Sequence, residues 1–504
     1  MFMGGKATFG MLHGWETCLY KIINEVWFDS KMVLVLFCLF VAGVLAWQIW
    51  YRMFRSPLAQ IPGPWLGKVT GLYEKYYLVQ AKLHTKLSDL HEEYGPIVHF
   101  GPNQVSMNSK KSVDIIYKSN LFLKSQLYQA FSFGGANMAT VSNQQSYNSW
   151  KRVVKKIFGS PSLKKIEPTI KEHVLTPFVE KLERLGTCDI YEAFHFITFD
   201  VVVDFLFSCK LNLVSNGDHP IVNWLRDAQF YGILQFLVPQ VKHSKGHFGQ
   251  EGFEAMIRFC QEIIDKRREE GPKEDTLQDL IDMIDDATGK PFSIEDVRAE
   301  LIILMIGAID TTANTLFWTL KLLLENPTEM EKLIAEIDAA FPSPDSITLD
   351  TIKEKCPYLA AVFNESMRMY PVGGGRAPRI VPKGGAEFEG HYLPVGTECG
   401  VTIYAYHRSS HIWKDPDTFR PARFLGPGSA EAKENMIPFL TGPRACVGRE
   451  MAKMIMNLTL VTLLRRFHIR WNSSNPNPAT TPICHIVLKP QELNFLIDAI
   501  PRCK

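Results

Sequence analysis

A cysteine near the C-terminal end lies in a segment that can be neither a helix nor a central strand. The segment runs Phe439-Leu440-Thr441-Gly442-Pro443-Arg444-Ala445-Cys446-Val447-Gly448, and its glycines and proline disfavour both regular structures. The sequence therefore predicts a tight loop with inward-pointing amides. Because residues 450–466 read as a mostly apolar helix, the loop delivers Cys446 to a helix N-terminus, which favours a thiolate. A metal-binding thiolate fits this pattern, with Phe439 beside the sulfur and Arg444 placed to meet an anion.

The spacing Phe-x-x-Gly-x-Arg-x-Cys-x-Gly resembles the haem-binding loop of the cytochrome P-450 family. The resemblance implies that Cys446 is the proximal thiolate ligand to the iron of haem b. It also assigns Phe439, Gly442 and Arg444 to the cofactor-binding loop. Cysteine is among the most frequently buried residues, so ordinary core packing of Cys446 is the alternative interpretation. The motifs upstream favour haem binding.

A second motif interrupts a long apolar helix predicted over residues 293–325, with Ser293 as its N-cap. At its centre lie Asp310 and two threonines, and an unpaired buried carboxylate would be costly. The stretch resembles the family's (Ala/Gly)-Gly-x-(Asp/Glu)-Thr-(Thr/Ser) signature, with Ala308 at the usual second glycine. The resemblance implies that Asp310 and Thr311 are catalytic and manage the protonation of oxygen. A threonine bonded back to its own helix is the structural alternative, and both can hold together.

The same resemblance assigns further cofactor contacts. Trp150, expected to open a helix, matches the tryptophan of a family Trp-x-x-x-Arg pair that contacts a haem propionate. Val154 stands where the arginine is expected, so Arg152 and Lys155 are candidate substitutes, although a solvated basic helix face explains both equally well. Arg379, which follows a proline, is the candidate for a propionate contact by the same resemblance.

Two elements resemble the part of the family that interlocks behind the haem loop. Glu365 and Arg368 stand at i and i+3 of a predicted helix, and Arg423 lies in Pro421-Ala422-Arg423-Phe424. The resemblance, in which a Glu-x-x-Arg motif meets a Pro-x-Arg-Phe motif, implies a structural charge network of these three residues. Arg376 has two open roles, contact with an acidic substrate or exposure to solvent.

An uncharged stretch from Met32 to Trp50 has about the ~20 residues needed to cross a bilayer. Interfacial aromatic residues end it and Arg52 follows, which predicts a single-pass transmembrane anchor over residues 32–51 with the catalytic part facing the cytosol. A cleaved signal peptide and a buried core helix are the alternatives. The length of the stretch argues against the first, and the lack of a polar face argues against the second.

The predicted fold is mainly α-helical with a small β-rich subdomain, the cytochrome P-450 fold, preceded by a transmembrane helix. Residues 73–94 are expected to form one helix, and residues 97–100 and 104–107 a hairpin. The predicted regions are an N-terminal segment (1–31), the anchor (32–51), an extended proline-rich hinge (52–64) and a haem-thiolate catalytic domain (65–504).

A formal net charge of +2 argues against nucleic acid as a partner. The ten cysteines are scattered, with no zinc-type spacing, which is typical of a cytosolic domain. The resemblance implies a monooxygenase of the endoplasmic reticulum membrane that oxidises a hydrophobic small molecule, similar to enzymes of fungal secondary metabolism. No Gly-x-Gly-x-x-Gly motif is present, so a separate NADPH-dependent flavoprotein reductase is the expected electron donor. The alternatives are desaturation, rearrangement or dehydration, and a haem sensor without turnover.

Overall fold

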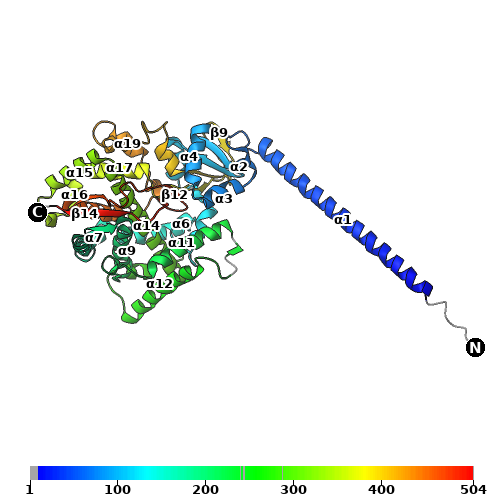
Figure 1. Cartoon of the computed structure of the whole chain (residues 1–504), viewed down its shortest axis with the longest axis horizontal. Coiled ribbons are helices and arrows are strands. Elements are labelled where there is room, and N and C mark those ends of the chain that lie inside the picture. Colours follow the sequence, from blue (N-terminus) through cyan, green and yellow to red (C-terminus); the bar gives the residue numbers. More distant parts are fainter. Residues whose placement is uncertain (1–8, 239, 242–244, 287, 503–504) are drawn as a thin grey trace, which may run out of the picture.

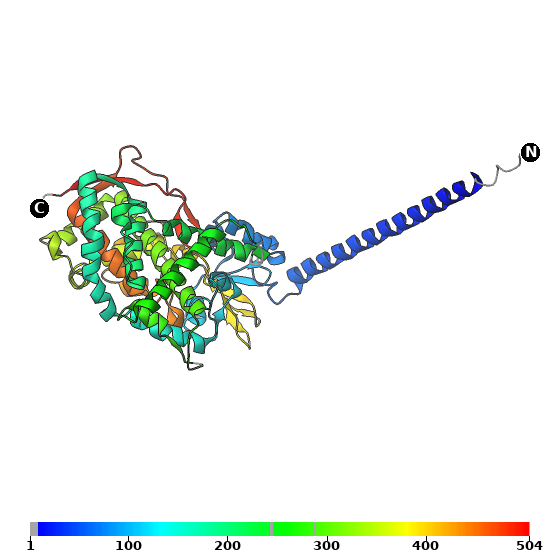
Figure 2. The same ribbon diagram turned by 90° about the horizontal axis from the view of Figure 1, so that it is seen from below.

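A long N-terminal helix stands apart from the rest of the chain (Figures 1 and 2). The computed structural model describes residues 9–238, 240–241, 245–286 and 288–502, and in the first helix it describes side chains from Met32 onward. Helix α1 (Phe9–Phe54) contains the apolar stretch Met32–Phe54, which is long enough to span a membrane and is not buried at all. It is a candidate membrane anchor at the predicted place. Of the predicted segment 1–31, residues 1–8 lie outside the described residues.

The segment that follows α1 packs against the rest of the protein and does not run as an extended chain. Residues 56–61 form successive turns, in which the amides of Ala59 and Ile61 donate to the carbonyls of Ser56 and Leu58. Leu58 and Ile61 are buried in the core of the β-rich region. The expectation of an extended backbone is therefore wrong for these residues. Burial of their apolar side chains lowers the free energy of the folded chain, and an extended, solvent-exposed segment would leave them in water.

The body is mainly helical, as predicted. Its helices of eight or more residues are α3 (Leu72–Val79), α4 (Leu83–Tyr94), α5 (Lys110–Tyr117), α6 (Gln144–Ile157), α7 (Ser160–Thr169), α8 (Thr176–Leu185), α9 (Ile190–Phe207), α11 (Ile221–Leu237), α12 (Gln250–Glu270), α14 (Ile294–Glu325), α15 (Pro327–Ala340), α17 (Pro357–Met369) and α20 (Arg449–Arg466). Shorter helices are α2 (Trp65–Val69), α10 (Leu213–Asn216), α13 (Thr276–Ile281), α16 (Leu349–Lys355), α18 (Ile403–Arg408) and α19 (Ser429–Asn435). Helix α14 packs against α9, α12, α17 and α20 at the centre of the largest core.

The β-rich region is small and lies at the end of the body from which α1 leaves (Figure 1). Its five-stranded sheet has the order β1 (Ile97–Gly101), β2 (Gln104–Met107), β10 (Glu398–Val401), β7 (Arg379–Ile380), β3 (Leu123–Lys124). Strands β1 and β2 form the predicted hairpin, and β10 joins β2 in parallel.

A second sheet has the order β11 (Phe467–Trp471), β14 (Leu496–Pro501), β4 (Thr187–Asp189). Two-stranded pairs are formed by β5 (Ile284–Asp285) with β6 (Lys290–Pro291), β8 (Ala386–Phe388) with β9 (His391–Leu393), and β12 (Pro482–Cys484) with β13 (Leu488–Pro490).

Three helix predictions have different outcomes. Ser293 caps α14 as expected, since its hydroxyl accepts a hydrogen bond from the amide of Asp296. The single helix expected over residues 73–94 is two helices, α3 and α4, separated where Ala81 takes a left-handed backbone with φ of 57°. Trp150 does not open a helix: α6 begins at Gln144, because Asn143 caps it.

Candidate active site

The cysteine segment forms the tight loop that its composition predicts. Gly442–Arg444 is a single turn of 3-10 helix, and the amide of Cys446 donates to the carbonyl of Phe439 at 2.8 Å. Gly442 has a positive φ of 74°, and a Cβ there would lie 2.0 Å from the carbonyl oxygen of Tyr117. Only glycine therefore allows this close approach. The loop leads directly into α20, which begins at Arg449.

The thiol of Cys446 lies deep in the protein and faces a cavity. Burial raises the pKa of this thiol, while the amides of Gly448 and Arg449 and the charge of the Arg449 guanidinium act in the opposite direction. The side chain remains accessible from the cavity, so a ligand there can reach the sulfur. Amide donors at the start of α20 would stabilise a thiolate once a cation meets it.

The cavity, named here the cysteine cavity, has a volume of about 380 Å³ and lies between α14 and the cysteine loop. Gly307, Ala308, Thr311 and Thr312 of α14 form one wall. The opposite wall contains Phe439, Leu440, Arg444, Ala445, Cys446, Val447 and Gly448. Apolar side chains complete the lining: Ile303 and Leu304 of α14, Met451 and Ile455 of α20, and Met138, Phe158, Val372 and Ile403 of other segments. The two predicted motifs therefore face each other across one apolar space.

Thr311 lies on the cavity wall, whereas Asp310 is not among the residues that line it. The Thr311 hydroxyl donates to the carbonyl of Gly307 at 2.7 Å, so it bonds back to its own helix as the structural alternative expected. The Asp310 carboxylate instead accepts a hydrogen bond from the Gln229 amide at 2.7 Å. The acid and the threonine thus serve different sides of α14.

A histidine that the sequence did not single out accompanies Asp310. Nε2 of His195, on α9, lies 3.7 Å from Oδ1 of Asp310, and Nδ1 lies 2.8 Å from the carbonyl oxygen of Tyr191. Because that carbonyl can only accept, Nδ1 carries a proton. Burial lowers the pKa of His195, while the Asp310 charge acts in the opposite direction.

Two basic side chains from segments far apart in the sequence, those of Lys124 and Arg444, line the cysteine cavity. Arg444 donates to the carbonyls of Val141 and Ser142 at 2.9 Å each, and its guanidinium lies 3.5 Å from the ring centre of Tyr147. Lys124 donates to two backbone carbonyls, at 2.9 and 2.8 Å. Both residues, with Tyr147, line the cavity. Lys124 and Tyr147 were missed, because neither belongs to a motif in the sequence.

The positive charges around the cavity act on one another. Burial and the charges of Arg444 and Arg379 lower the pKa of Lys124 to about 7, with Glu300 acting in the opposite direction. Burial, together with the charge of Arg379, also lowers the pKa of Arg444 to about 10. An anion placed among these groups would relieve both effects.

The other two residues predicted to bind the cofactor, Arg379 and Trp150, lie away from the cysteine cavity. Arg379 is buried and donates to the Tyr128 hydroxyl at 2.9 Å. Trp150 is fully buried and its ring lies 4.2 Å from that of Phe292. Neither residue lines the cysteine cavity. Their roles as propionate contacts stay predictions.

The candidate substitutes for the expected arginine are not at the cavity either. Arg152 pairs with Asp286 at 2.6 Å on the surface, and Lys155 is exposed. Lys151, one position before Arg152, donates to the carbonyl of Pro443 in the cysteine loop at 2.8 Å. The cations that line the cavity are therefore Lys124 and Arg444.

The predicted charge network is present. Glu365 is fully buried and accepts from Nε of Arg368 at 2.8 Å and from Nε of Arg423 at 3.0 Å. Arg376 takes neither of its expected roles, because it is buried between Glu74 and Glu398 in an internal ion-pair cluster.

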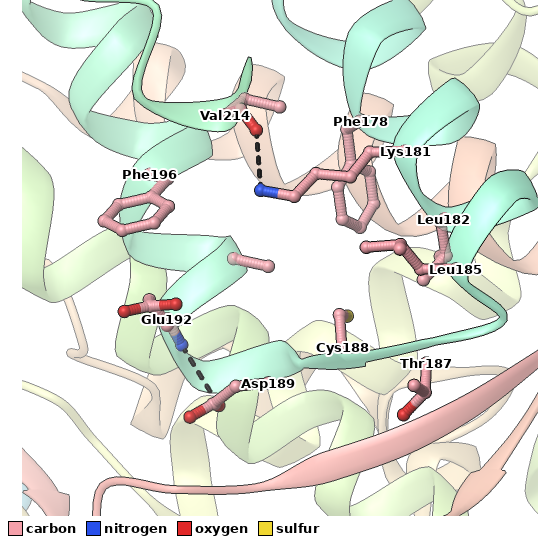
Figure 3. A pocket seen from close by; sticks show the side chains of 11 residues that line it. Phe178, Lys181, Leu182, Leu185, Thr187, Cys188, Asp189, Glu192, Phe196 and Val214 are labelled. Carbon is pink, nitrogen blue, oxygen red and sulfur yellow. Dashed lines mark hydrogen bonds between the residues drawn. The ribbon is translucent and has the colours of Figure 1, made fainter. Parts of the chain in front are cut away.

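A separate pocket of about 190 Å³ lies between α8, β4 and α9 and shares no residue with the cysteine cavity (Figure 3). Two of its polar side chains, Lys181 and Asp189, already have structural partners. The Lys181 ammonium donates to the carbonyl of Val214 at 3.0 Å, and Asp189 caps α9. Burial raises the pKa of Cys188 to about 12, so this thiol is not reactive at neutral pH. The pocket therefore has a structural explanation.

The cysteine cavity suits a flat, anionic cofactor that carries a metal. A Cβ added at Gly307, Gly373 or Gly448 would meet no atom within 4 Å, so these positions leave open space along both walls. Lys124 and Arg444 supply positive charge at its edge, and Cys446 supplies a sulfur ligand. Within the described part of the chain, no group of three or more His, Cys, Asp or Glu residues is arranged to hold a metal ion. These residues therefore fit a metal ion that is already held by an organic cofactor and takes one further ligand, the sulfur, from the protein.

The fold and this cavity define a helical protein built around a cysteine-facing cofactor pocket. The family model described as cytochrome P-450 matches residues 57–497, and the chain belongs to this family, whose cofactor is haem iron. It is an oxidoreductase of the cytochrome P-450 monooxygenase type.

Similar proteins are fungal. Cytochrome P-450 monooxygenase acrD of Aspergillus aculeatus is 29% identical over 451 residues, which cover 84% of this chain and 88% of that protein. Cytochrome P-450 monooxygenase FUS8 of Gibberella fujikuroi is 29% identical over 467 residues, covering 89% and 90%. The crystal structure of the cytochrome P-450DA heme domain superposes with a TM-score of 0.76 at 20% identity, covering 88% of this chain and 98% of that one. The predicted family and fold are confirmed.

Proposed function

We propose that this protein is a membrane-anchored haem-thiolate monooxygenase that inserts one atom of O2 into a hydrophobic small molecule of fungal secondary metabolism. The observation that carries the proposal is the position of Cys446, which faces Thr311 of α14 across a mostly apolar cavity. Cys446 would supply the thiolate ligand to the haem iron, and Lys124 and Arg444 would hold the haem carboxylates. When bound, haem with a thiolate ligand supplies O2 activation and cleavage of the O–O bond.

The residues of this chain position the substrate and supply protons. The aliphatic side chains of the cavity exclude water and favour an apolar substrate. The Thr311 hydroxyl donates its hydrogen to the carbonyl of Gly307, so the lone pairs of its oxygen remain to accept a hydrogen bond from a donor in the cavity.

Asp310 and His195 form a pair that can take up a proton behind Thr311. The ring nitrogen Nε2 and the carboxylate oxygen Oδ1 are both acceptors when His195 is neutral and Asp310 is ionised. A proton on either atom turns this contact of two acceptors into a donor and an acceptor. Asp310 precedes Thr311 in α14 but does not line the cavity, so delivery of this proton to the cavity requires a change of the Asp310 rotamer.

The remaining parts of the proposal concern partners and location. Electrons come from a separate NADPH-dependent flavoprotein reductase, and the exposed apolar stretch of α1 anchors the chain in the endoplasmic reticulum membrane. The divisions 1–31, 32–51, 52–64 and 65–504 correspond to an N-terminal segment, an anchor, a linker and the catalytic domain. The names of the fungal relatives support the assignment to monooxygenases.

Labelled oxygen tests the reaction. The chain and its Cys446→Ser variant are expressed with a reductase in a metabolite-producing fungal host under 18O2, and products are compared by mass. We expect one labelled oxygen atom in a product that only the unchanged chain forms, and complete loss of the thiolate-type spectrum of the reduced carbon monoxide complex in the variant. A product without label would instead indicate desaturation, rearrangement or dehydration. A retained thiolate spectrum would rule out Cys446 as the ligand.

The role of Thr311 has a matched control on the same helix. Thr315 bonds back to the carbonyl of Thr311 at 2.7 Å but does not line the cavity. Thr311→Ala should divert electrons to hydrogen peroxide and lower product formation by about a hundredfold, because the proton relay is lost. Thr315→Ala should keep the ratio of product to electrons consumed. Equal coupling in both variants would make Thr311 a structural residue only.

A further inference from the structure

A second apolar cavity lies beside the cysteine cavity, on the side of α4. It has a volume of about 200 Å³ and is lined by residues of α3, α4, η1 (Gln126–Phe131), α11 and the turn between β12 and β13. Consecutive residues of the same segments line the two cavities: Arg376 and Thr402 face this one, and Ala377 and Ile403 face the cysteine cavity. The two spaces therefore share a wall. We name the second space the histidine cavity after His84, which lines it.

His84 is a buried polar residue without a partner. Its side chain is 2% exposed, and neither Nδ1 nor Nε2 has a hydrogen-bond partner in the described structure. The ring is held edge-on against Tyr404, with 4.8 Å between the ring centres. A neutral imidazole always carries one donor and one acceptor, and leaving them unmade in an apolar site is costly. Neither nitrogen is exposed to the cavity in the orientation that the ring adopts, so a polar group that enters would bond to one of them after the ring rotates.

The charges around the cavity indicate what kind of group this is. Burial and the charge of Arg408 lower the pKa of His84 to about 4, so the imidazole is neutral at physiological pH. The guanidinium that lines the cavity, that of Arg376, is already paired with Glu74 and with Glu398. Two carboxylates against one guanidinium disfavour an anionic ligand. The recognition chemistry is therefore that of a neutral oxygen.

We propose that the histidine cavity binds a neutral hydroxyl or carbonyl group of the substrate and that His84 is its hydrogen-bond partner. The proposal deepens the proposed function and rests on it, because the apolar remainder of the substrate occupies the cysteine cavity. His84 is then a specificity-determining residue that touches substrate away from the reacting carbon. It follows that the substrate already carries oxygen, so a reaction that leaves a hydroxyl or carbonyl group on an apolar skeleton must precede this enzyme.

A set of compounds with one carbon skeleton tests this proposal. Menthol, menthone, p-menthane and p-menthane-3-carboxylate differ only in the polar group, and equilibrium dialysis against the haem-loaded full chain in lipid nanodiscs measures their binding without turnover. We expect menthol and menthone to bind about three- to tenfold more tightly than p-menthane, the worth of one neutral hydrogen bond. The carboxylate should bind more weakly than menthol.

Substitutions at position 84 assign the preference to the histidine. His84→Phe keeps a ring against Tyr404 but removes both nitrogens, so menthol and p-menthane should bind equally while binding of p-menthane stays unchanged. His84→Gln should restore part of the preference. Loss of affinity for all four compounds in His84→Phe would indicate a packing role and overturn the proposal.

The results on the unchanged chain are equally decisive. Equal binding of menthol and p-menthane, tightest binding of the carboxylate, or binding of none of the four compounds would overturn the proposal. Because dialysis requires no oxygen chemistry, these outcomes are independent of the labelled-oxygen experiment, which alone decides whether the protein is a monooxygenase.

Discussion

Two buried clusters of charge in this protein are built differently. In one, Glu365 directly contacts two guanidinium groups, those of Arg368 and Arg423, at 2.8 and 3.0 Å. In the other, Lys124 and Arg444 lie at the cysteine cavity, and within the described residues they donate to backbone carbonyls and to a side-chain amide, with no carboxylate in ion-pair contact. The first cluster contains its own counterion, whereas the second has cations that remain available to an anion.

This difference separates structural charge from binding charge. A buried ion pair with good geometry fixes the elements that carry it, here α17 and the turn Pro421–Phe424, and its loss leaves an uncompensated charge in the interior. Cations that meet only neutral acceptors keep a net attraction for an anion that enters. Substitutions in the two clusters should therefore affect different properties of the protein.

The largest expected effect is on stability and follows from the first cluster. Glu365→Gln leaves Arg368 and Arg423 buried without a counterion, so the free energy of unfolding should fall by about 3–5 kcal/mol. Urea unfolding of the purified chain, followed by circular dichroism, measures this loss. Glu270→Gln is the control, because Glu270 pairs with Lys273 on the surface, and it should leave the unfolding curve nearly unchanged. Similar curves for the two variants would show that the Glu365 cluster does not hold the fold.

Local patterns account for the parts of the fold that the sequence predicted. The cap at Ser293, the hairpin around Gly101 and the loop ending at Cys446 all depend on residues close together in the chain. The helix start at Trp150 was wrong because Asn143 supplies a cap about two turns earlier. The break at Ala81 was missed because alanine has no tendency toward a left-handed backbone, so tertiary packing must impose it.

The site was predicted where a motif supplied it. Cys446 and Thr311 line one cavity, but Tyr147 joins it through a contact with Arg444, about 300 residues away, and Lys124 through bonds to the carbonyls of Met138 and Ala139; the sequence has no pattern for either. The same limit applies to Arg376, whose partners Glu74 and Glu398 come from distant segments. Charges that are paired only in the tertiary structure cannot be told from free ones in the sequence.

The second cluster should affect cofactor retention more than stability. Lys124→Met removes a cation from the cysteine cavity, so haem should leave about tenfold faster, because a hydrogen bond to a charged group is lost. Transfer of haem to excess apomyoglobin measures the rate. Lys321→Met is the matched control: Lys321 is also buried but is paired with Glu325 at 2.5 Å, so this variant should lose stability and keep haem as the unchanged chain does. Equal rates of haem loss would remove the distinction between the two kinds of cluster.

A further effect concerns Glu300, an acid whose charge acts on Lys124 of the second cluster. Glu300 is fully buried on α14, one carboxylate oxygen accepts from the amide of Met138 at 2.6 Å, and burial raises the pKa of its carboxyl group to about 7. A pKa raised from 4.5 means that the folded protein binds this proton more tightly than the unfolded chain does. The stabilisation is present below about pH 4.5 and is lost as the pH rises toward 7.

Glu300→Gln removes that titration and preserves the contact with Met138. The thermal midpoint of the unchanged chain should therefore fall between pH 5 and 7 relative to that of the variant, and the two curves should run parallel below about pH 4.5. Differential scanning calorimetry across this range measures the difference. If both proteins showed the same pH dependence, Glu300 would be ionised throughout and Lys124 would have a counterion after all, which would place the second cluster in the same class as the first.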